Sequence, residues 1–195
     1  MGRQVRRPHS RTEGPRLKFI ETGFPGLFVV DINPVTDVRG FFARSFCVRE
    51  FEKYGLDPAV AQCNISFNEN AGTLRGLHYQ AAPFEEAKLV RCTVGAIHDV
   101  VVDLRRESPR FLQSYAVELT AENRRMIFVP KGFAHGFQTL SDRSEVFYMM
   151  SEFYHPESAR GLRWNDPALA IRWPLENPIM SEKDQAYPLL TDLEK

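Results

Sequence analysis

Short runs of β-branched and aromatic residues, each ended by Gly, Pro, Asn or Asp, are the feature that most constrains this chain. Runs of five to nine such residues favour strands, and no helical pattern alternates with them as a parallel α/β sheet would require. The chain is therefore predicted to be all-β, a double-sheet jelly roll with few short helices. From Leu27 onward the runs are LFVVDI, GFFARSFC, TLRGLHYQ, KLVRCTV, AIHDVVVDL, RMIFVP, GFQTL and EVFYMM.

One of these runs also predicts how its side chains are divided between two faces. In AIHDVVVDL, Ile97, Asp99, Val101 and Asp103 should lie on one face of the strand, and the residues between them on the other. Helical signal is limited to residues 48–54 and 181–185.

Length and charge restrict the organisation of the chain and the partners it can have. With 195 residues, 43% of them hydrophobic, one core is the default, so we expect a single domain over residues 18–195. Residues 1–17 are rich in arginine and lack the apolar run of a secretory signal, which predicts a basic, disordered tail. Lys plus Arg equals Asp plus Glu at 25 each, so no global charge attracts nucleic acid or an anionic membrane.

Cysteine usage and hydropathy bear on the compartment. The three cysteines are widely spaced and include no CxxC pair, which is typical of a reduced, cytoplasmic protein. No stretch of the sequence approaches the eighteen or so apolar residues that a membrane span needs.

Two segments with matching patterns carry the chemistry. The first, GTLRGLHYQ, begins at Gly72 and contains His78 and Gln80; the second, PKGFAH, ends at His135. They resemble the two half-motifs of the cupin jelly rolls, in which histidines and a glutamate bind a metal. Here a lysine, Lys88, stands where that glutamate would be, and an amide replaces one histidine. An ammonium repels a divalent cation and an amide is a poor ligand for it, so no metal is expected.

The residues that remain suit a different reaction. A histidine can accept a proton near neutral pH, and a nearby lysine can stabilise the oxyanion that forms when a carbon beside a ketone loses its proton. A base combined with an oxyanion clamp predicts enolisation, which needs neither a metal nor a redox cofactor.

An ordered set of strings extends this interpretation over most of the chain. From about Phe24 to about Pro188 it resembles the dTDP-4-dehydrorhamnose 3,5-epimerase family, the cupin-fold epimerases of nucleotide-linked 4-keto sugars. The strings that carry the resemblance are TLRGLHYQ, EAKLVRC, GAIHDVVVDLR, VPKGFAHGF, YMMSEFYHP, RWNDPALAIRWPL and SEKDQAYP. The resemblance implies epimerisation at C3 and C5 of such a sugar through an enolate, without a cofactor.

Catalytic roles follow from the resemblance, residue by residue. It implies that His78 is the general base, oriented by the carboxylate of Asp184, and that Tyr148 is the acid that returns a proton from the opposite face of the ring. Lys88 would face the C4 oxygen and stay protonated. Asp99 is a further candidate, as a residue that orients a side chain of the site without contacting the substrate.

Substrate contacts and a partner are implied in the same way. Arg75, together with Arg39 from a partner subunit, would pair with the diphosphate. The family also implies a homodimer with exchanged N-terminal strands, which would cover open sheet edges. The remaining positions implied to contact the sugar nucleotide are Gln62, Asn64, His135 and Tyr154, the last stacking on the base.

Two positions depart from the family pattern and leave alternatives open. Arg44 stands where the family has a glutamate, and Ala159 where an acid is common. The nucleotide or the sugar substituents can therefore differ. The alternatives are a single-site epimerase or ketoisomerase of another nucleotide sugar, a cupin that binds sugar nucleotides without turnover, and a metal-dependent cupin enzyme.

Overall fold

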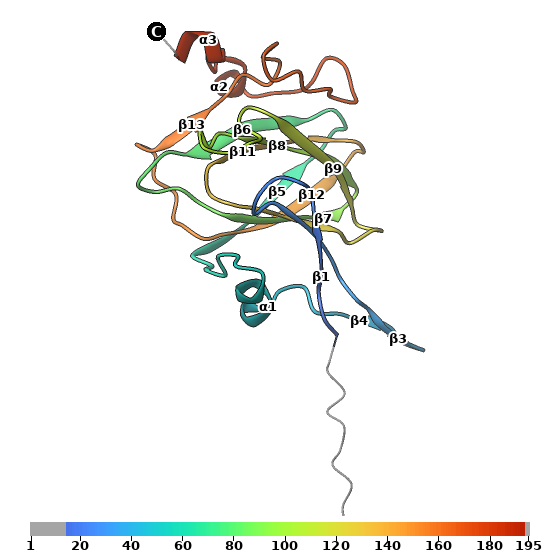
Figure 1. Cartoon of the computed structure of the whole chain (residues 1–195). Helices are drawn as coiled ribbons and strands as arrows, with labels where there is room; N and C mark the ends of the chain where they lie inside the picture. The colour runs from blue at the N-terminus through green and yellow to red at the C-terminus, as the bar shows by residue number, and fades with distance from the viewer. Residues whose placement is uncertain (1–14, 194–195) are drawn as a thin grey trace, which may run out of the picture.

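Two antiparallel sheets packed face to face make up the body of the protein in the computed structural model, which describes residues 15–193 (Figure 1). A six-stranded sheet has the order β1-β2-β10-β7-β12-β5, and a five-stranded sheet the order β13-β6-β11-β8-β9. The first consists of β1 (Lys18–Glu21), β2 (Phe28–Asp31), β10 (Met126–Val129), β7 (Lys88–Val94), β12 (Ser144–Met150) and β5 (Gln62–Asn68). The second consists of β13 (Ala159–Gly161), β6 (Leu74–Gln80), β11 (Phe133–Thr139), β8 (Ala96–Asp103) and β9 (Ser114–Thr120). The predicted all-β jelly roll is confirmed.

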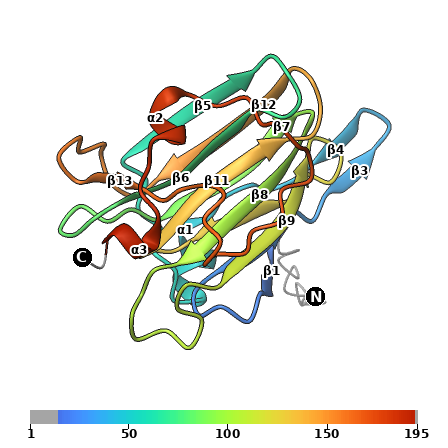
Figure 2. The ribbon, with the colours of Figure 1, turned by 90° about the horizontal axis from the view of Figure 1, so that it is seen from above.

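Three short helices complete the fold, and two of them were predicted. α1 (Val48–Lys53) lies on the side of the six-stranded sheet, whereas α2 (Glu182–Gln185) and α3 (Leu190–Leu193) lie over the five-stranded sheet (Figures 1 and 2). α2 begins where Ser181 caps it, its side chain accepting a hydrogen bond from a backbone N–H three residues on. None of the helices in the described part of the chain is long and apolar enough to cross a membrane.

The predicted division of AIHDVVVDL between two faces is confirmed. Ile97 and Val101 of β8 pack in the core between the sheets. Val100 and Val102 pack on the outer face, against a C-terminal segment that contributes Leu162, Leu169, Ile171 and Trp173. Both faces of this strand are buried, because the chain after residue 160 runs back over the five-stranded sheet (Figure 2). That segment brings α2 against the middle of β6, where Asp184 meets Gly76 and His78.

A two-stranded arm, β3 (Val35–Asp37) and β4 (Gly40–Phe42), projects away from the body (Figure 1). The predicted strand GFFARSFC is therefore correct only for its first three residues, and α1 begins directly after it. Arg44 in this stretch forms an ion pair with Glu50 of α1. The chain is therefore held against the helix and does not pair with a neighbouring strand. The arm exposes apolar side chains, with Phe42 71% exposed and Val38 fully exposed.

The predicted N-terminal tail is only partly described. Residues 1–14 lie outside the described residues, so the disordered tail and the single-domain organisation over 18–195 stay predictions. At the boundary, Leu17 is buried in the core cluster beside α1, and its N–H donates a hydrogen bond of 2.8 Å to Glu50.

Candidate active site

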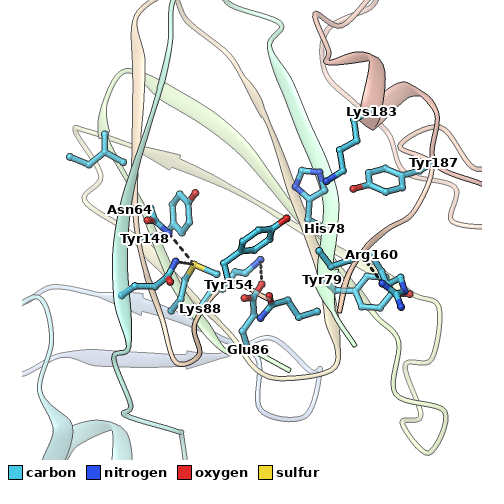
Figure 3. Close-up of a pocket in the computed structure, with 15 residues that line it drawn as sticks. Asn64, His78, Tyr79, Glu86, Lys88, Tyr148, Tyr154, Arg160, Lys183 and Tyr187 are labelled. Atoms are coloured by element: carbon cyan, nitrogen blue, oxygen red, sulfur yellow. Dashed lines mark hydrogen bonds and ion pairs between the residues drawn. The ribbon is translucent and has the colours of Figure 1, made fainter. Parts of the chain in front are cut away.

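Two adjoining cavities, of about 550 and 300 Å³, lie between the sheets and share four lining residues, His78, Lys88, Tyr148 and Lys183. Figure 3 shows the larger cavity, with Tyr148 and Asn64 on one side and His78, Lys183 and Tyr187 on the other. The three groups predicted to exchange protons and stabilise charge therefore meet around one space. The larger cavity is also lined by Gln62, Asn64, Ile65, Tyr79, Gln80, Glu86, Met150, Tyr154, Ala159, Arg160 and Tyr187.

His78, on β6, is paired with a carboxylate from the other end of the chain. Its Nε2 lies 2.7 Å from Asp184 Oδ1, and the second carboxylate oxygen accepts a hydrogen bond of 3.3 Å from the Gly76 N–H. The cap by Ser181 fixes the turn that carries Asp184. A proton held between Nε2 and the carboxylate leaves Nδ1 as the basic nitrogen. The ring is 42% exposed and so is open to a substrate.

Electrostatics keeps the partner of His78 ionised. Burial alone would raise the pKa of Asp184, but hydrogen bonds from His78 and the Gly76 N–H, with the charges of His78 and Lys183, leave this pKa below its ordinary value. An ionised, fixed carboxylate orients the imidazole and stabilises the imidazolium that forms when it takes a proton.

This lowered pKa predicts how stability depends on pH. A carboxyl with a lowered folded-state pKa contributes stability that is present above its unfolded value, near 3.8, and is lost as pH falls through the folded value. Wild-type protein should therefore lose thermal stability more steeply below pH 4 than Asp184→Asn, which has no carboxylate to protonate at this position. Thermal midpoints measured from pH 7 to pH 3 test this. Parallel curves for the two proteins would contradict the pairing.

Tyr148 approaches the cavity from the opposite sheet, on β12. Burial raises the pKa of its phenol; the nearby charge of Arg75 lowers it and that of Glu86 raises it further. A phenol that keeps its proton at neutral pH can donate it. Because His78 and Tyr148 belong to facing sheets, a ring held between them would meet the base on one face and the acid on the other.

Lys88, at the start of β7, pairs with an acid that we did not predict. Its Nζ lies 2.8 Å from Glu86 Oε1, and both side chains are buried, with 10% and 6% exposed. The two residues are two positions apart at the beginning of a strand, a spacing that places side chains on one face and could have indicated the pair.

A second histidine–carboxylate pair lies beside the first. His135 of β11 is the register partner of His78, and its Nε2 lies 2.8 Å from Asp99 Oδ2. The candidate supporting role of Asp99 therefore applies to His135. The strands approach closely because Gly76 and Gly136 face each other: a Cβ on Gly76 would lie 2.7 Å from the Gly136 Cα.

The predicted binding residues reach the cavities with one exception. Gln62 and Asn64 line the larger cavity and donate to Met150 Sδ, and Tyr154 stands at its rim, 54% exposed. Arg75 lines the smaller cavity, where its Nε donates a hydrogen bond of 2.8 Å to Asn68 Oδ1.

The exception is Arg39, at the tip of the β3–β4 arm. It forms an ion pair with Asp37 and is 85% exposed, and it lines neither cavity of its own chain.

Four further polar residues line the larger cavity and were not predicted: Tyr79, Arg160, Lys183 and Tyr187. The Tyr187 ring lies 5.8 Å from the His78 ring, and it fits there because Gly161 has no side chain: a Cβ would lie 2.3 Å from it. Lys183 directly precedes Asp184, so the string SEKDQAYP already contained two of these residues.

The positions that bind metal in other cupins have different partners here. The Gln80 amide donates to the carbonyls of Phe84 and Phe153, and its oxygen accepts from the His155 N–H. The Lys88 ammonium faces the same space. Among the described residues, no group of three or more His, Cys, Asp or Glu side chains could hold a metal ion.

Fold and site together define a jelly-roll isomerase, an enzyme that removes a proton from one face of a carbon and returns one from the other. A family model described as dTDP-4-dehydrorhamnose 3,5-epimerase matches residues 21–192. The chain belongs to this family.

Relatives and solved structures agree with that assignment. A dTDP-4-dehydrorhamnose 3,5-epimerase of Shigella flexneri is 43% identical over 86% of this chain and 93% of its own. The Legionella pneumophila epimerase RmlC, solved with dTDP-4-keto-L-rhamnose, superposes with a TM-score of 0.84 at 40% identity, covering 90% of this chain and 94% of that one. ChmJ of Streptomyces bikiniensis, a 3'-monoepimerase solved with dTDP-quinovose, superposes with a TM-score of 0.81 at 32% identity. The match covers 88% of this chain and 87% of that one.

Of the two departures from the family pattern, one lies in the site. Ala159 lines the larger cavity, so a methyl group replaces an acid there. Arg44 lies beside α1, in ion contact with Glu50, and lines neither of the two cavities.

Proposed function

We propose that the protein epimerises a nucleotide-linked 4-keto-6-deoxy sugar at C3 and C5, converting dTDP-4-dehydro-6-deoxyglucose to dTDP-4-dehydrorhamnose. The observation that carries the proposal is the placing of His78 and Tyr148 on facing sheets, with the Lys88 ammonium lining the same cavity. Family membership and relatives of the same activity support the choice of substrate.

In the proposed reaction each residue has one role. His78, oriented by Asp184, removes the proton at C5, and the electron pair moves to the C4 oxygen, where Lys88 stabilises the resulting enolate. Tyr148 then donates a proton to C5 from the opposite face. His78 then releases its proton to solvent and Tyr148 regains one from solvent. A second cycle at C3 inverts that carbon, because the same ketone acidifies both positions. All electrons stay on the substrate, so this chemistry requires no redox cofactor.

Deuterium exchange tests the reaction at each carbon. Incubating the wild-type protein with dTDP-4-dehydro-6-deoxyglucose in deuterated water should place deuterium at both C3 and C5, read by NMR. Exchange at one carbon only would favour a single-site epimerase, an alternative that similarity to a 3'-monoepimerase keeps open. No exchange at either carbon would contradict catalysis and leave a sugar-nucleotide-binding protein.

Removing the acid should separate exchange from inversion. In Tyr148→Phe the base and the ammonium remain, so deuterium should still enter at C5 while the yield of inverted sugar falls by about 10²-fold or more. The same NMR experiment measures both. Tyr115→Phe is the matched control, because Tyr115 packs against the core between the sheets and lines neither active-site cavity. Unchanged epimerisation in Tyr148→Phe would remove Tyr148 from the mechanism.

For the nucleotide end, we propose that Arg75 binds the diphosphate and that Tyr154 stacks on the base, with Gln62, Asn64 and His135 contacting the sugar nucleotide. The cavity positions of these side chains and the dTDP-bound relatives support this. Arg39 would contribute to the diphosphate site of a second copy, through an exchanged β3–β4 arm. The projecting arm and its exposed apolar residues support a homodimer.

The dimer has a direct test. Sedimentation should give twice the mass of the 22.4 kDa chain. Arg39→Ala should raise KM with little change in kcat, since a diphosphate contact stabilises ground and transition states alike. A monomer with full activity would exclude the exchange. We also propose a cytoplasmic setting, supported by three cysteines that form no disulfide.

A further inference from the structure

Glu86 is the one acid that lies directly against the Lys88 ammonium, and the proposed mechanism gives it no role. Its Oε1 contacts Lys88 Nζ at 2.8 Å, whereas its Oε2 is buried and has no hydrogen-bond partner among the described residues. A buried carboxylate with one oxygen unsatisfied is costly, and such groups call for an explanation.

The backbone around Glu86 holds the carboxylate in place. The next residue, Ala87, donates its N–H to Ser151 Oγ at 2.8 Å and accepts from the Ser151 N–H at 2.9 Å. The preceding turn is fixed by Gln80, whose amide donates to the Phe84 carbonyl at 2.9 Å. Glu86 therefore belongs to a rigid wall of the larger cavity.

The other charged and titratable groups around this space show why an acid is useful here. β6 supplies His78 and Arg75, and β11 supplies His135, which is paired with Asp99 of β8. α2 supplies Lys183 and Asp184, and β12 supplies Tyr148. The cavity is also lined by Arg160 and by three further phenols, those of Tyr79, Tyr154 and Tyr187. The two other carboxylates, Asp99 and Asp184, are each engaged by a histidine. Glu86 is thus the anion available to Lys88.

We propose that Glu86 is a positioning residue that holds the Lys88 ammonium toward the substrate carbonyl and places a negative charge near the Tyr148 phenol. A buried ammonium that contacts a carboxylate is held in one place by a charge-assisted hydrogen bond. A phenol near the same anion is also harder to ionise, and after burial and Arg75 the charge of Glu86 is among the causes that set the pKa of Tyr148. One carboxylate thereby fixes the ammonium and disfavours ionisation of the phenol.

The test compares pH profiles of kcat in Glu86→Gln, which keeps the side-chain shape and removes the charge. This inference rests on the proposed function, so wild-type protein is assayed first on dTDP-4-dehydro-6-deoxyglucose. In Glu86→Gln the alkaline limb of kcat should move to lower pH, by up to about one unit, because the Tyr148 phenol loses the nearby anion. KM should change little. Glu85→Gln, one residue earlier and lining neither cavity, should keep the wild-type profile.

A merely structural role would lower kcat equally at all pH values and leave the limb in place, and that result would overturn the proposal. Should Glu86→Gln fail to fold, Glu86→Asp decides. Its carboxylate is one methylene further from Lys88, so the limb should move in the same direction by a smaller amount, and an unmoved limb overturns the proposal. Inactive wild-type protein would instead overturn the proposed function itself.

Discussion

Replacing His78 by alanine is expected to lower kcat for epimerisation by about 10²- to 10⁴-fold, the usual contribution of a positioned general base. KM should change little, because a base acts on the proton in the transition state more than it binds the ground state. Deuterium exchange at C3 and C5 should fall in parallel, since His135, the other histidine paired with a carboxylate, lines only the smaller of the two cavities. NMR assays of both carbons measure this.

His98→Gln is the matched control for that loss. His98 lies on the outer face of β8, where its ring meets Trp173 at 6.2 Å, and burial lowers its pKa. It lines neither active-site cavity, so its replacement should leave turnover at the wild-type level. Full activity in His78→Ala would discard the mechanism, whatever the control shows.

Replacing Lys88 by methionine is expected to affect both turnover and folding. Loss of the ammonium should lower kcat by about 10²- to 10³-fold, as for other groups that stabilise a developing oxyanion. It should also lower the free energy of unfolding by about 3–5 kcal/mol, because Glu86 is left as a buried charge without its partner. Turnover assays and urea denaturation at 25 °C measure the two effects separately.

A double variant distinguishes catalysis from stability at this pair. Glu86→Gln combined with Lys88→Met removes both charges, so most of the lost stability should return. Activity should not return, because the oxyanion still has no cation. A double variant as unstable as Lys88→Met alone, or a Lys88→Met protein with normal turnover, would contradict the assigned role of this ammonium.

The sequence predicted those parts of the molecule whose signals are local. The alternation in β8 and the isolated helical patterns at α1 and α2 are read within a few residues, and all three are confirmed. The all-β class follows from repeated short runs. β9 was missed although Tyr115, Val117 and Leu119 alternate toward the core in it; only Leu119 and Thr120 are buried, and its pairing with β8 makes it a strand.

The candidate catalytic residues stand in short strings with a fixed order, and the structure brings them around one cavity; their contact partners could not all be predicted in this way. Glu85 and Glu86 are neighbours of the same type, and the period of two that selects Glu86 applies only if the chain is already extended before β7 begins at Lys88. Tyr187 reaches His78 through a tertiary contact between distant segments. The proposed contact of Arg39 with the diphosphate requires a second copy of the chain, so the structure of a single chain does not contain it.

The order in which the chain leaves the ribosome gives the pairing of His78 with Asp184 a further consequence. Both inner core clusters draw on residues before position 150, so the sandwich can assemble while the last segment is still being synthesised. Asp184 lies 106 positions after the imidazole that it orients. The nascent protein therefore acquires its fold first and the carboxylate partner of the proposed base last. Translation stopped before Ser181 would yield a folded sandwich that lacks Asp184.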